Sequence, residues 1–118
     1  MAWLLRDGDV LCSLETAAGS IGRGRGLLGR DAIEGALLLK PAMSVHTLGM
    51  RFPIDVVFVA PERGLLRVIA VRETIRPFRF VRARARRNAG VGALELAEGE
   101  AHRLGLSPGT SLLLKRFL

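Results

Sequence analysis

The sequence predicts an α+β domain that is mostly β, with about seven mainly antiparallel strands curling into a small barrel-like sheet and one or two short helices. Three observations lead to this fold class. Short runs rich in β-branched and aromatic residues recur between glycine and proline turns. These runs do not alternate with long helical segments, which argues against a doubly wound parallel sheet. The run at residues 65–74 is apolar on both faces, as expected for a barrel wall.

The first half of the chain contains two segments that predict strands and one that predicts a loop. Residues 2–16 predict a hairpin, because apolar runs flank Asp7-Gly8, a pair that favours a tight turn. Residues 17–30 are rich in glycine and arginine but lack the Gly-Lys-Ser/Thr ending of a phosphate-binding loop, so we interpret them as a loop with a short helical turn. Residues 35–40 form an apolar run that ends at a proline and predict a buried strand.

The second half contains residues 54–60, the run most typical of a strand, in which a single aspartate interrupts β-branched and aromatic residues. A proline and glycine turn joins it to the strand predicted at residues 65–74. The other predicted elements are an extended segment at 44–48, a strand-like segment at 79–87, a strand at 93–96, a helix at 98–105 capped by Gly105, a type II turn at 107–110 and a last strand at 111–117.

The length of 118 residues predicts one domain, residues 1–118, because it is close to the commonest domain size. No apolar run reaches the ~20 residues that span a bilayer, and the apolar start is too short for a signal peptide, so the expected location is cytoplasmic. Cys12 is the only cysteine, and its apolar neighbours predict a buried, inert thiol. With only two histidines, His46 and His102, we expect no metal site, and no cofactor is indicated.

Four motifs occur in a recognisable order across roughly residues 22–114. They are Gly26-Leu27-Leu28-Gly29-Arg30, Phe52-Pro53-Ile54-Asp55-Val56-Val57-Phe58, Ala93-Leu94-Glu95-Leu96 and Gly105-Leu106-Ser107-Pro108-Gly109-Thr110. This order resembles the uncharacterised DUF192 family, whose pattern centres on Pro-Leu/Ile-Asp-x-x-Phe. Many members carry Trp-Met-Lys-Asn-Thr before this centre, whereas this chain has His46-Thr47-Leu48-Gly49-Met50, which indicates a divergent branch. The resemblance implies a compact β-rich domain and supplies no established activity.

Asp55 is the strongest single candidate for a functional residue. Its apolar neighbours predict burial, and a buried carboxylate must be paired or neutralised. The structural interpretation is an anchor for Arg51, Arg30 or nearby backbone N–H groups. The functional interpretation is a general base or a ligand-orienting group with a shifted pKa. In a hydrolase-type enzyme, His46 would be its acid–base partner.

The favoured function is a small non-enzymatic binding or accessory domain with a pocket near Asp55 for a small anionic ligand or peptide. Guanidinium groups bind carboxylate and phosphate in a bidentate way, so arginines near this aspartate are expected contacts. The predicted ligand-binding residues are Arg30, His46, Thr47, Arg51, Asp55 and Glu95. An enzyme that uses His46 and Asp55 stays open as an alternative.

Nucleic-acid binding is a second alternative, because the net charge of +7 is concentrated between Arg72 and Arg87, where seven arginines accompany one acid, Glu73. It is not favoured, since only Phe78 and Phe80 lie among these arginines as platforms for base stacking, and arginine-rich strands are also common as solvated edges. The candidate residues are Arg76, Arg79, Arg82, Arg84, Arg86 and Arg87. The alternation of arginine and alanine from residue 82 predicts three guanidinium groups on one side.

Overall fold

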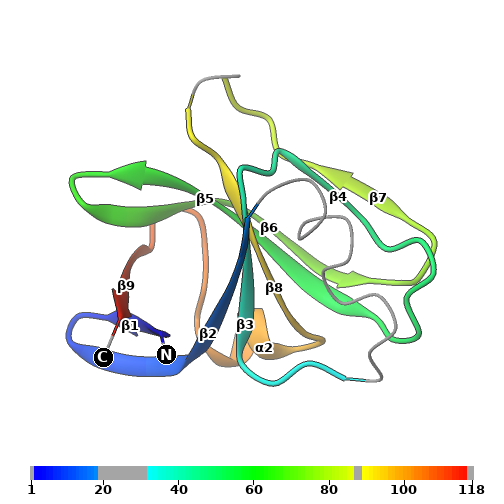
Figure 1. Cartoon of the computed structure of the whole chain (residues 1–118), viewed down its shortest axis with the longest axis horizontal. Helices are drawn as coiled ribbons and strands as arrows, with labels where there is room; N and C mark the ends of the chain where they lie inside the picture. Colours follow the sequence, from blue (N-terminus) through cyan, green and yellow to red (C-terminus); the bar gives the residue numbers. More distant parts are fainter. Residues whose placement is uncertain (1, 19–31, 87–88, 117–118) are drawn as a thin grey trace.

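Seven strands close into a barrel in the order β1-β2-β3-β8-β5-β6-β9, and β4 and β7 form a separate two-stranded sheet (Figure 1). The structure is a computed structural model that describes residues 2–18, 32–86 and 89–116. Its elements are β1 (Ala2–Arg6), β2 (Asp9–Ala18), β3 (Ala36–Lys40), β4 (Ser44–His46), β5 (Ile54–Glu62), β6 (Leu65–Ile75), β7 (Phe80–Arg82), β8 (Gly92–Ala97), α2 (Glu100–Arg103) and β9 (Ser111–Arg116). The mostly β fold class predicted from the sequence is confirmed.

The strand pairs of the barrel are antiparallel except for β2 and β3, which are parallel. Two tight hairpins build much of this pattern. Asp7 and Gly8 between β1 and β2, and Arg63 and Gly64 between β5 and β6, all have positive φ angles. Positive φ at both central residues gives a turn whose twist matches that of the flanking strands. The hairpin predicted at residues 2–16 is therefore confirmed, with β2 continuing to Ala18.

Two apolar clusters lie on opposite sides of the barrel wall. Because side chains alternate along a strand, Val57 and Val59 of β5 face the barrel interior with Leu94 and Leu96 of β8. Ile54, Val56 and Phe58 face outward, where Val45 of β4 and Ala83 after β7 pack over them. The sheet of β4 and β7 thus covers one outer face of the barrel, and this explains why β5 is buried on both faces. Two-sided burial of this kind makes a strand read as a continuous apolar run.

The predicted helix at 98–105 is shorter in the structure and spans only Glu100–Arg103. Gly99 and Gly105, with φ angles of 88° and 67°, place left-handed backbone on either side of it. Its predicted inner residues Ala101 and Leu104 are buried. None of the helices in the described residues is long and apolar enough to cross a membrane. The helical turn predicted within 17–30 lies outside the described residues.

The strand-like segment predicted at 79–87 is a strand only at Phe80–Arg82. The predicted alternation nevertheless continues beyond the strand, because Arg82, Arg84 and Arg86 are exposed while the alanines between them are buried or half-buried. Ala83 N–H donates a backbone hydrogen bond to the Met43 carbonyl, which keeps this segment against the chain that leads into β4. All three guanidinium-bearing residues are thus exposed, and their projection to one common side stays a prediction.

Candidate functional site

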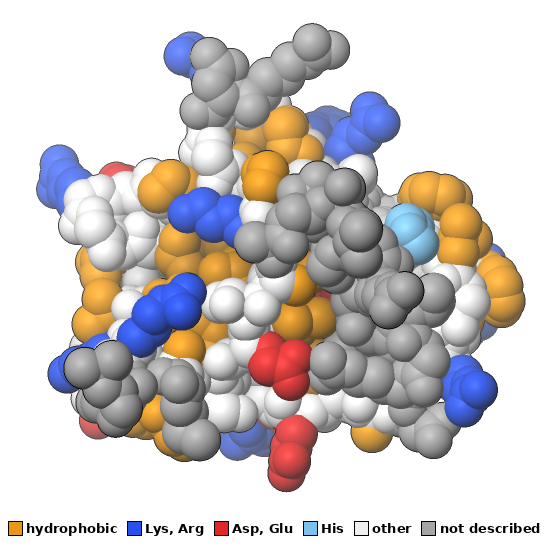
Figure 2. All heavy atoms as spheres, in the orientation of Figure 1, with side chains coloured by type: hydrophobic (Ala, Val, Ile, Leu, Met, Phe, Trp, Pro, Cys, Tyr) orange, Lys and Arg blue, Asp and Glu red, His pale blue; other side chains and the backbone are white. Residues whose placement is uncertain are grey.

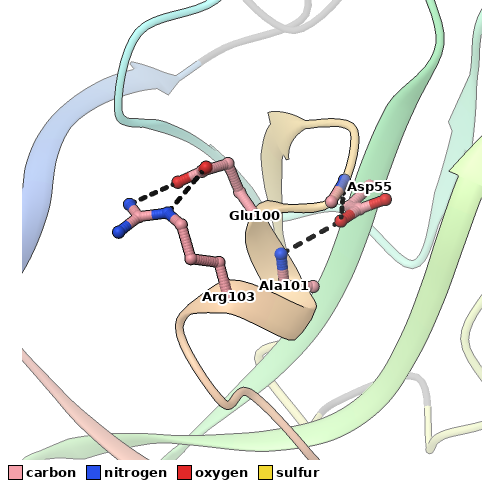
Figure 3. A network of polar contacts seen from close by, with 5 residues as sticks. Asp55, Glu100, Ala101 and Arg103 are labelled. Carbon is pink, nitrogen blue, oxygen red and sulfur yellow. Dashed lines mark hydrogen bonds and ion pairs between the residues drawn. The ribbon is translucent and has the colours of Figure 1, made fainter.

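Asp55 lies near the start of β5, fully buried, and both of its carboxylate oxygens accept backbone hydrogen bonds, of which Figure 3 shows the two to Oδ2. Oδ1 accepts from the Thr74 N–H group at 2.9 Å. Oδ2 accepts from the N–H groups of Gly99 and Ala101, each at 3.0 Å. These donors come from the end of β6 and from the first turn around α2, where N–H groups have no partner within the helix. The carboxylate therefore ties three segments of main chain together at one end of the barrel.

This geometry corrects the functional interpretation of Asp55. A general base or a ligand contact needs a route to its partner and a free lone pair directed at it. Asp55 has no exposed surface, and its oxygens are directed at backbone donors. The role that fits is the structural one, an anchor for nearby backbone N–H groups. We therefore abandon the pocket near Asp55, and with it the expected anionic-ligand site there.

His46 does not share a site with Asp55. It lies on β4, outside the barrel, where it is exposed and paired across the small sheet with Phe80. Its Nδ1 accepts a hydrogen bond from the Leu48 N–H group at 3.3 Å, and its ring lies 6.0 Å from the Phe80 ring at an interplanar angle of 51°. Asp55 faces the opposite side of the β5 wall, with Val57. The acid–base pair required by the hydrolase alternative is therefore not formed.

Thr47 is fully buried and acts as a centre of hydrogen bonds that positions residues 76–79. Its Oγ1 donates to the Arg76 carbonyl at 2.6 Å and accepts from the Arg79 N–H group at 2.9 Å. Its backbone N–H donates to the Arg79 carbonyl, and its own carbonyl accepts from the N–H groups of Phe78 and Met50. A hydroxyl engaged in this way holds main chain in place, so the expected ligand-binding role of Thr47 is replaced by a positioning role.

Two other predicted ligand residues, Glu95 and Arg51, lie in the described part of the chain. Glu95 is buried on β8, where it is the cross-strand partner of Val56, a residue of the outer face. Asp55 and Glu95 consequently point to opposite sides of the barrel wall. Arg51 is exposed in the loop after β4. Arg30 lies outside the described residues, as does Arg87 of the nucleic-acid candidates.

Exposed apolar side chains, among them both phenylalanines that the sequence offers as stacking platforms, lie on and next to the β4–β7 sheet. Phe78 and Phe80 are 63% and 72% exposed, and Leu48, two residues after His46, is also exposed. We call Leu48, Phe78 and Phe80, together with His46, the aromatic face. In Figure 2, hydrophobic side chains gather beside a histidine over the region of β4 and β7. Exposed aromatic rings grouped on one face are typical of an interaction surface.

The backbone of Phe78 shows how this face is built. Its φ angle of 64° lies in the left-handed region, which is uncommon for a bulky residue and costs about 1–3 kcal/mol. Two features hold it there: the Phe78 N–H group donates to the Thr47 carbonyl at 2.9 Å, and Thr47 Oγ1 bridges Arg76 and Arg79 on either side. The surrounding structure thus maintains a strained residue whose ring remains in solvent. Strained residues of this kind are concentrated at functional sites.

Across residues 2–18, 32–86 and 89–116, the His, Cys, Asp and Glu side chains form no group of three or more that could hold a metal ion. Cys12 is half-buried, and burial raises the pKa of its thiol, with the nearby Glu100 carboxylate adding to the effect. A thiol with a raised pKa is a poor nucleophile at neutral pH.

Two solved structures share this fold. One, a protein of unknown function from Novosphingobium aromaticivorans, has a TM-score of 0.75 at 22% sequence identity, and the match covers 94% of this chain and 81% of that one. The other, a "putative transcription regulator" from Sinorhizobium meliloti, has a TM-score of 0.72 at 22% identity, with 94% and 89% covered. At this identity the likeness concerns the fold alone. No curated protein matches the sequence.

The family comparison agrees with the order of motifs along the chain. The model of the family described as Uncharacterized ACR, DUF192, matches residues 3–114. This range runs from β1 into β9, so it includes the barrel except for the outermost residues of those two strands, together with the β4–β7 sheet and α2. The chain therefore belongs to the DUF192 family.

Proposed function

We propose that this protein is a binding domain for single-stranded nucleic acid and that the aromatic face is its contact surface. The observation that carries the proposal is the exposure of the Phe78 and Phe80 rings among exposed arginines. Bases stack on aromatic rings without regard to sequence, and guanidinium groups bind the phosphates between them. The proposal reverses the order expected from the sequence, where an anionic-ligand pocket at Asp55 was favoured.

The rings are placed where bases could reach them. Phe80 projects from the outward side of β7 opposite His46, and Phe78 precedes it on the loop held by Thr47. A flexible loop would lose conformational entropy on binding, whereas this loop is fixed beforehand by its hydrogen bonds. Such a preorganised platform is suited to stacking against bases that are already unpaired.

The arginines supply a path for the phosphate backbone. Arg82 lies on the same side of β7 as Phe80, and the exposed series continues through Arg84 and Arg86. Arg76 and Arg79 flank Phe78 along the chain. Among the residues that the structure describes, these five arginines make no ion pair with an acidic side chain. Their charge is thus available to phosphates, which supply the sequence-independent part of the affinity.

The fold favours a single strand over a duplex. Reading a DNA duplex in its major groove usually requires a helix or a two-stranded ribbon inserted into the groove. The helix found in the described residues spans only Glu100–Arg103, and the two-stranded sheet of β4 and β7 has strands of three residues and is packed over the barrel wall through Val45 and Ala83. Exposed phenylalanines need unstacked bases, which single strands provide and duplexes do not.

Fluorescence anisotropy with labelled oligo(dT), oligo(U) and a duplex of the same length tests the proposal. We expect both single strands to bind more tightly than the duplex, with affinity falling steeply as salt rises. The double variant Phe78→Ala/Phe80→Ala should weaken binding by roughly 10- to 100-fold, because each stacked base contributes ~1–3 kcal/mol. Arg82→Gln/Arg84→Gln should lower the slope of log affinity against log salt by about 1–2.

Two control variants separate this surface from general effects of charge and apolar area. Val10→Ala/Leu113→Ala removes two other exposed apolar side chains, from β2 and β9. Lys40→Gln/Arg116→Gln removes the same charge as the arginine variant but at the barrel end. Neither control variant should reproduce the loss of affinity for oligo(dT) and oligo(U) that Phe78→Ala/Phe80→Ala causes. Absence of binding, or binding that survives Phe78→Ala/Phe80→Ala unchanged, would rule out the aromatic face as the contact surface.

A further inference from the structure

The barrel interior is hollow at the end where the β5–β6 hairpin lies. A pocket of about 410 Å³ opens there, with Thr16, Leu38, Lys40, Leu66, Leu114 and Arg116 among its lining residues. This volume falls within the range of small-molecule sites, ~300–1,000 Å³. Toward the left of Figure 2, hydrophobic side chains lie between lysine and arginine side chains. The pocket is separate from the aromatic face and from Asp55.

The strand register explains the chemistry of the pocket. Inward-facing residues of a barrel strand alternate with outward-facing ones, so each strand contributes one series of side chains to the interior. Two such series are Ala36, Leu38 and Lys40 on β3, and Leu112, Leu114 and Arg116 on β9. Both are apolar deep in the barrel and end in a cation at the rim. The pocket therefore has apolar walls below and positive charge at its mouth.

The two cations at the mouth have no acidic partner in the part of the chain that the structure describes. Lys40 and Arg116 are exposed, and neither makes an ion pair there. None of the described residues that line the pocket is an aspartate or a glutamate. Two like charges placed over an apolar hollow, with no carboxylate between them, form a site that is complementary to an anion.

The lining also restricts what the rest of the ligand can be. The described lining residues supply leucine, alanine and proline side chains and one hydroxyl, on Thr16, but no aromatic ring on which a base could stack. A nucleotide would leave its base without a platform and its hydroxyl groups against leucine, and unpaired polar groups are costly when buried. An alkyl chain, by contrast, gains from leaving water in proportion to its apolar area.

We propose that this pocket binds a medium-chain alkyl carboxylate, with the alkyl chain among the leucines and the carboxylate between Lys40 and Arg116. Guanidinium and ammonium groups bind carboxylate through charge-assisted hydrogen bonds. Because both cations are exposed to solvent at the mouth of the pocket, the carboxylate can keep part of its hydration shell. The site is independent of the proposed nucleic-acid surface, because the two share no residues and lie on different parts of the fold.

Isothermal titration of the full chain with sodium octanoate tests the proposal, with acetate and octylammonium as ligand controls. Octanoate should bind at least about tenfold more tightly than acetate, which lacks the chain, and than octylammonium, which carries the opposite charge. It should also raise the melting temperature, because a ligand that binds only the folded state stabilises it. Equal binding of octanoate and octylammonium, or no binding of octanoate, overturns the proposal.

Variants locate the site. Lys40→Gln/Arg116→Gln should weaken octanoate binding by about tenfold or more. Arg82→Gln/Arg84→Gln removes the same charge from the β4–β7 side and should leave octanoate binding unchanged. Leu114→Trp, which fills the hollow without altering charge, should abolish binding while circular dichroism shows a folded chain. Octanoate binding that is unaffected by both pocket variants places the ligand elsewhere and contradicts the assignment.

Discussion

The two ends of the barrel differ in whether their charged side chains have hydrogen-bond or ion-pair partners within the fold. At one end, Asp55 is fully buried and accepts three backbone hydrogen bonds, from Thr74, Gly99 and Ala101. At the other, Lys40 and Arg116 stand exposed over a hollow, without an acidic partner in the described residues. A buried charge whose partners are all supplied by the fold stabilises that fold. A charge at a rim with no partner is instead available to something outside it.

The comparison predicts that replacing Asp55 is the most damaging change at either end. Asp55→Ala removes an acceptor from three backbone N–H groups, so we expect a loss of about 3–5 kcal/mol in the free energy of unfolding. This is a large part of the ~5–15 kcal/mol available to a typical domain. Urea denaturation followed by circular dichroism measures the loss.

Asp55→Asn should be less damaging, because the amide keeps one acceptor oxygen. Lys40→Gln at the open end should change the free energy of unfolding by less than about 0.5 kcal/mol, as is usual for surface substitutions. Similar losses for Asp55→Ala and Lys40→Gln would remove the contrast between the two ends.

Truncating a leucine at each end of the barrel should give a smaller difference in the loss of stability. Leu96 is fully buried next to Asp55 across the β5–β8 pair, so Leu96→Ala leaves a sealed cavity and should cost about 2–5 kcal/mol. Leu66 lines the open pocket, where truncation only widens a space that solvent can enter. Leu66→Ala should therefore cost about 1 kcal/mol. Thermal unfolding of both variants measures the difference, and equal losses would indicate that the pocket is as tightly packed as the core.

The smallest expected effect concerns an ion pair on α2 at the closed end. The Arg103 guanidinium donates to both oxygens of Glu100, at 2.8 and 2.6 Å, and holds the pKa of Glu100 below its ordinary value (Figure 3). Because the folded-state pKa is lowered, the stabilisation is present above the ordinary pKa of 4.5 and is lost as the pH falls through the folded value. Solvent screens this surface pair, so Glu100→Gln should lower the melting temperature at neutral pH by only about 1–2 °C.

Melting temperatures measured between neutral and acid pH test the sign of this effect. The difference between the native chain and Glu100→Gln should disappear at acid pH. Glu98→Gln is the matched control, since Glu98 is exposed in the same segment and makes no ion pair in the described residues. A difference that grows as the pH falls would contradict the assignment to the Arg103 pair.

Much of the fold could be predicted because local signals agreed with the barrel. Asp7-Gly8 indicated the first hairpin, the apolar run at 54–60 indicated β5, and the glycines at 99 and 105 lie at either end of α2. The strand at 65–74 suggested a barrel through its two apolar faces. What could not be predicted was that β4 and β7 leave the barrel and cover its wall, since three-residue strands carry too little pattern to reveal their partner.

The site was harder to predict, for a reason that Asp55 illustrates. The sequence showed that a carboxylate inside an apolar run needs partners, but its partners are main-chain N–H groups, which every residue except proline possesses. Side-chain types therefore gave no indication of them. The positions of Asp55 and Glu95 on opposite sides of the wall depend on strand register, which becomes visible only after folding. The exposure of Phe78 likewise follows from a backbone conformation imposed by Thr47 from outside its own segment.

The pairing of β1 with β9 has a consequence for how this chain folds during synthesis. The first and last strands in sequence order complete the barrel, with Ala2 opposite Arg116. Until β9 has left the ribosome, β1 and β6 both present unpaired edges, which are prone to join other chains. Closure also depends on contacts between residues far apart in sequence, which form slowly. We expect nascent chains that stop before β9 to need protection by a chaperone, because their barrel stays open along one seam.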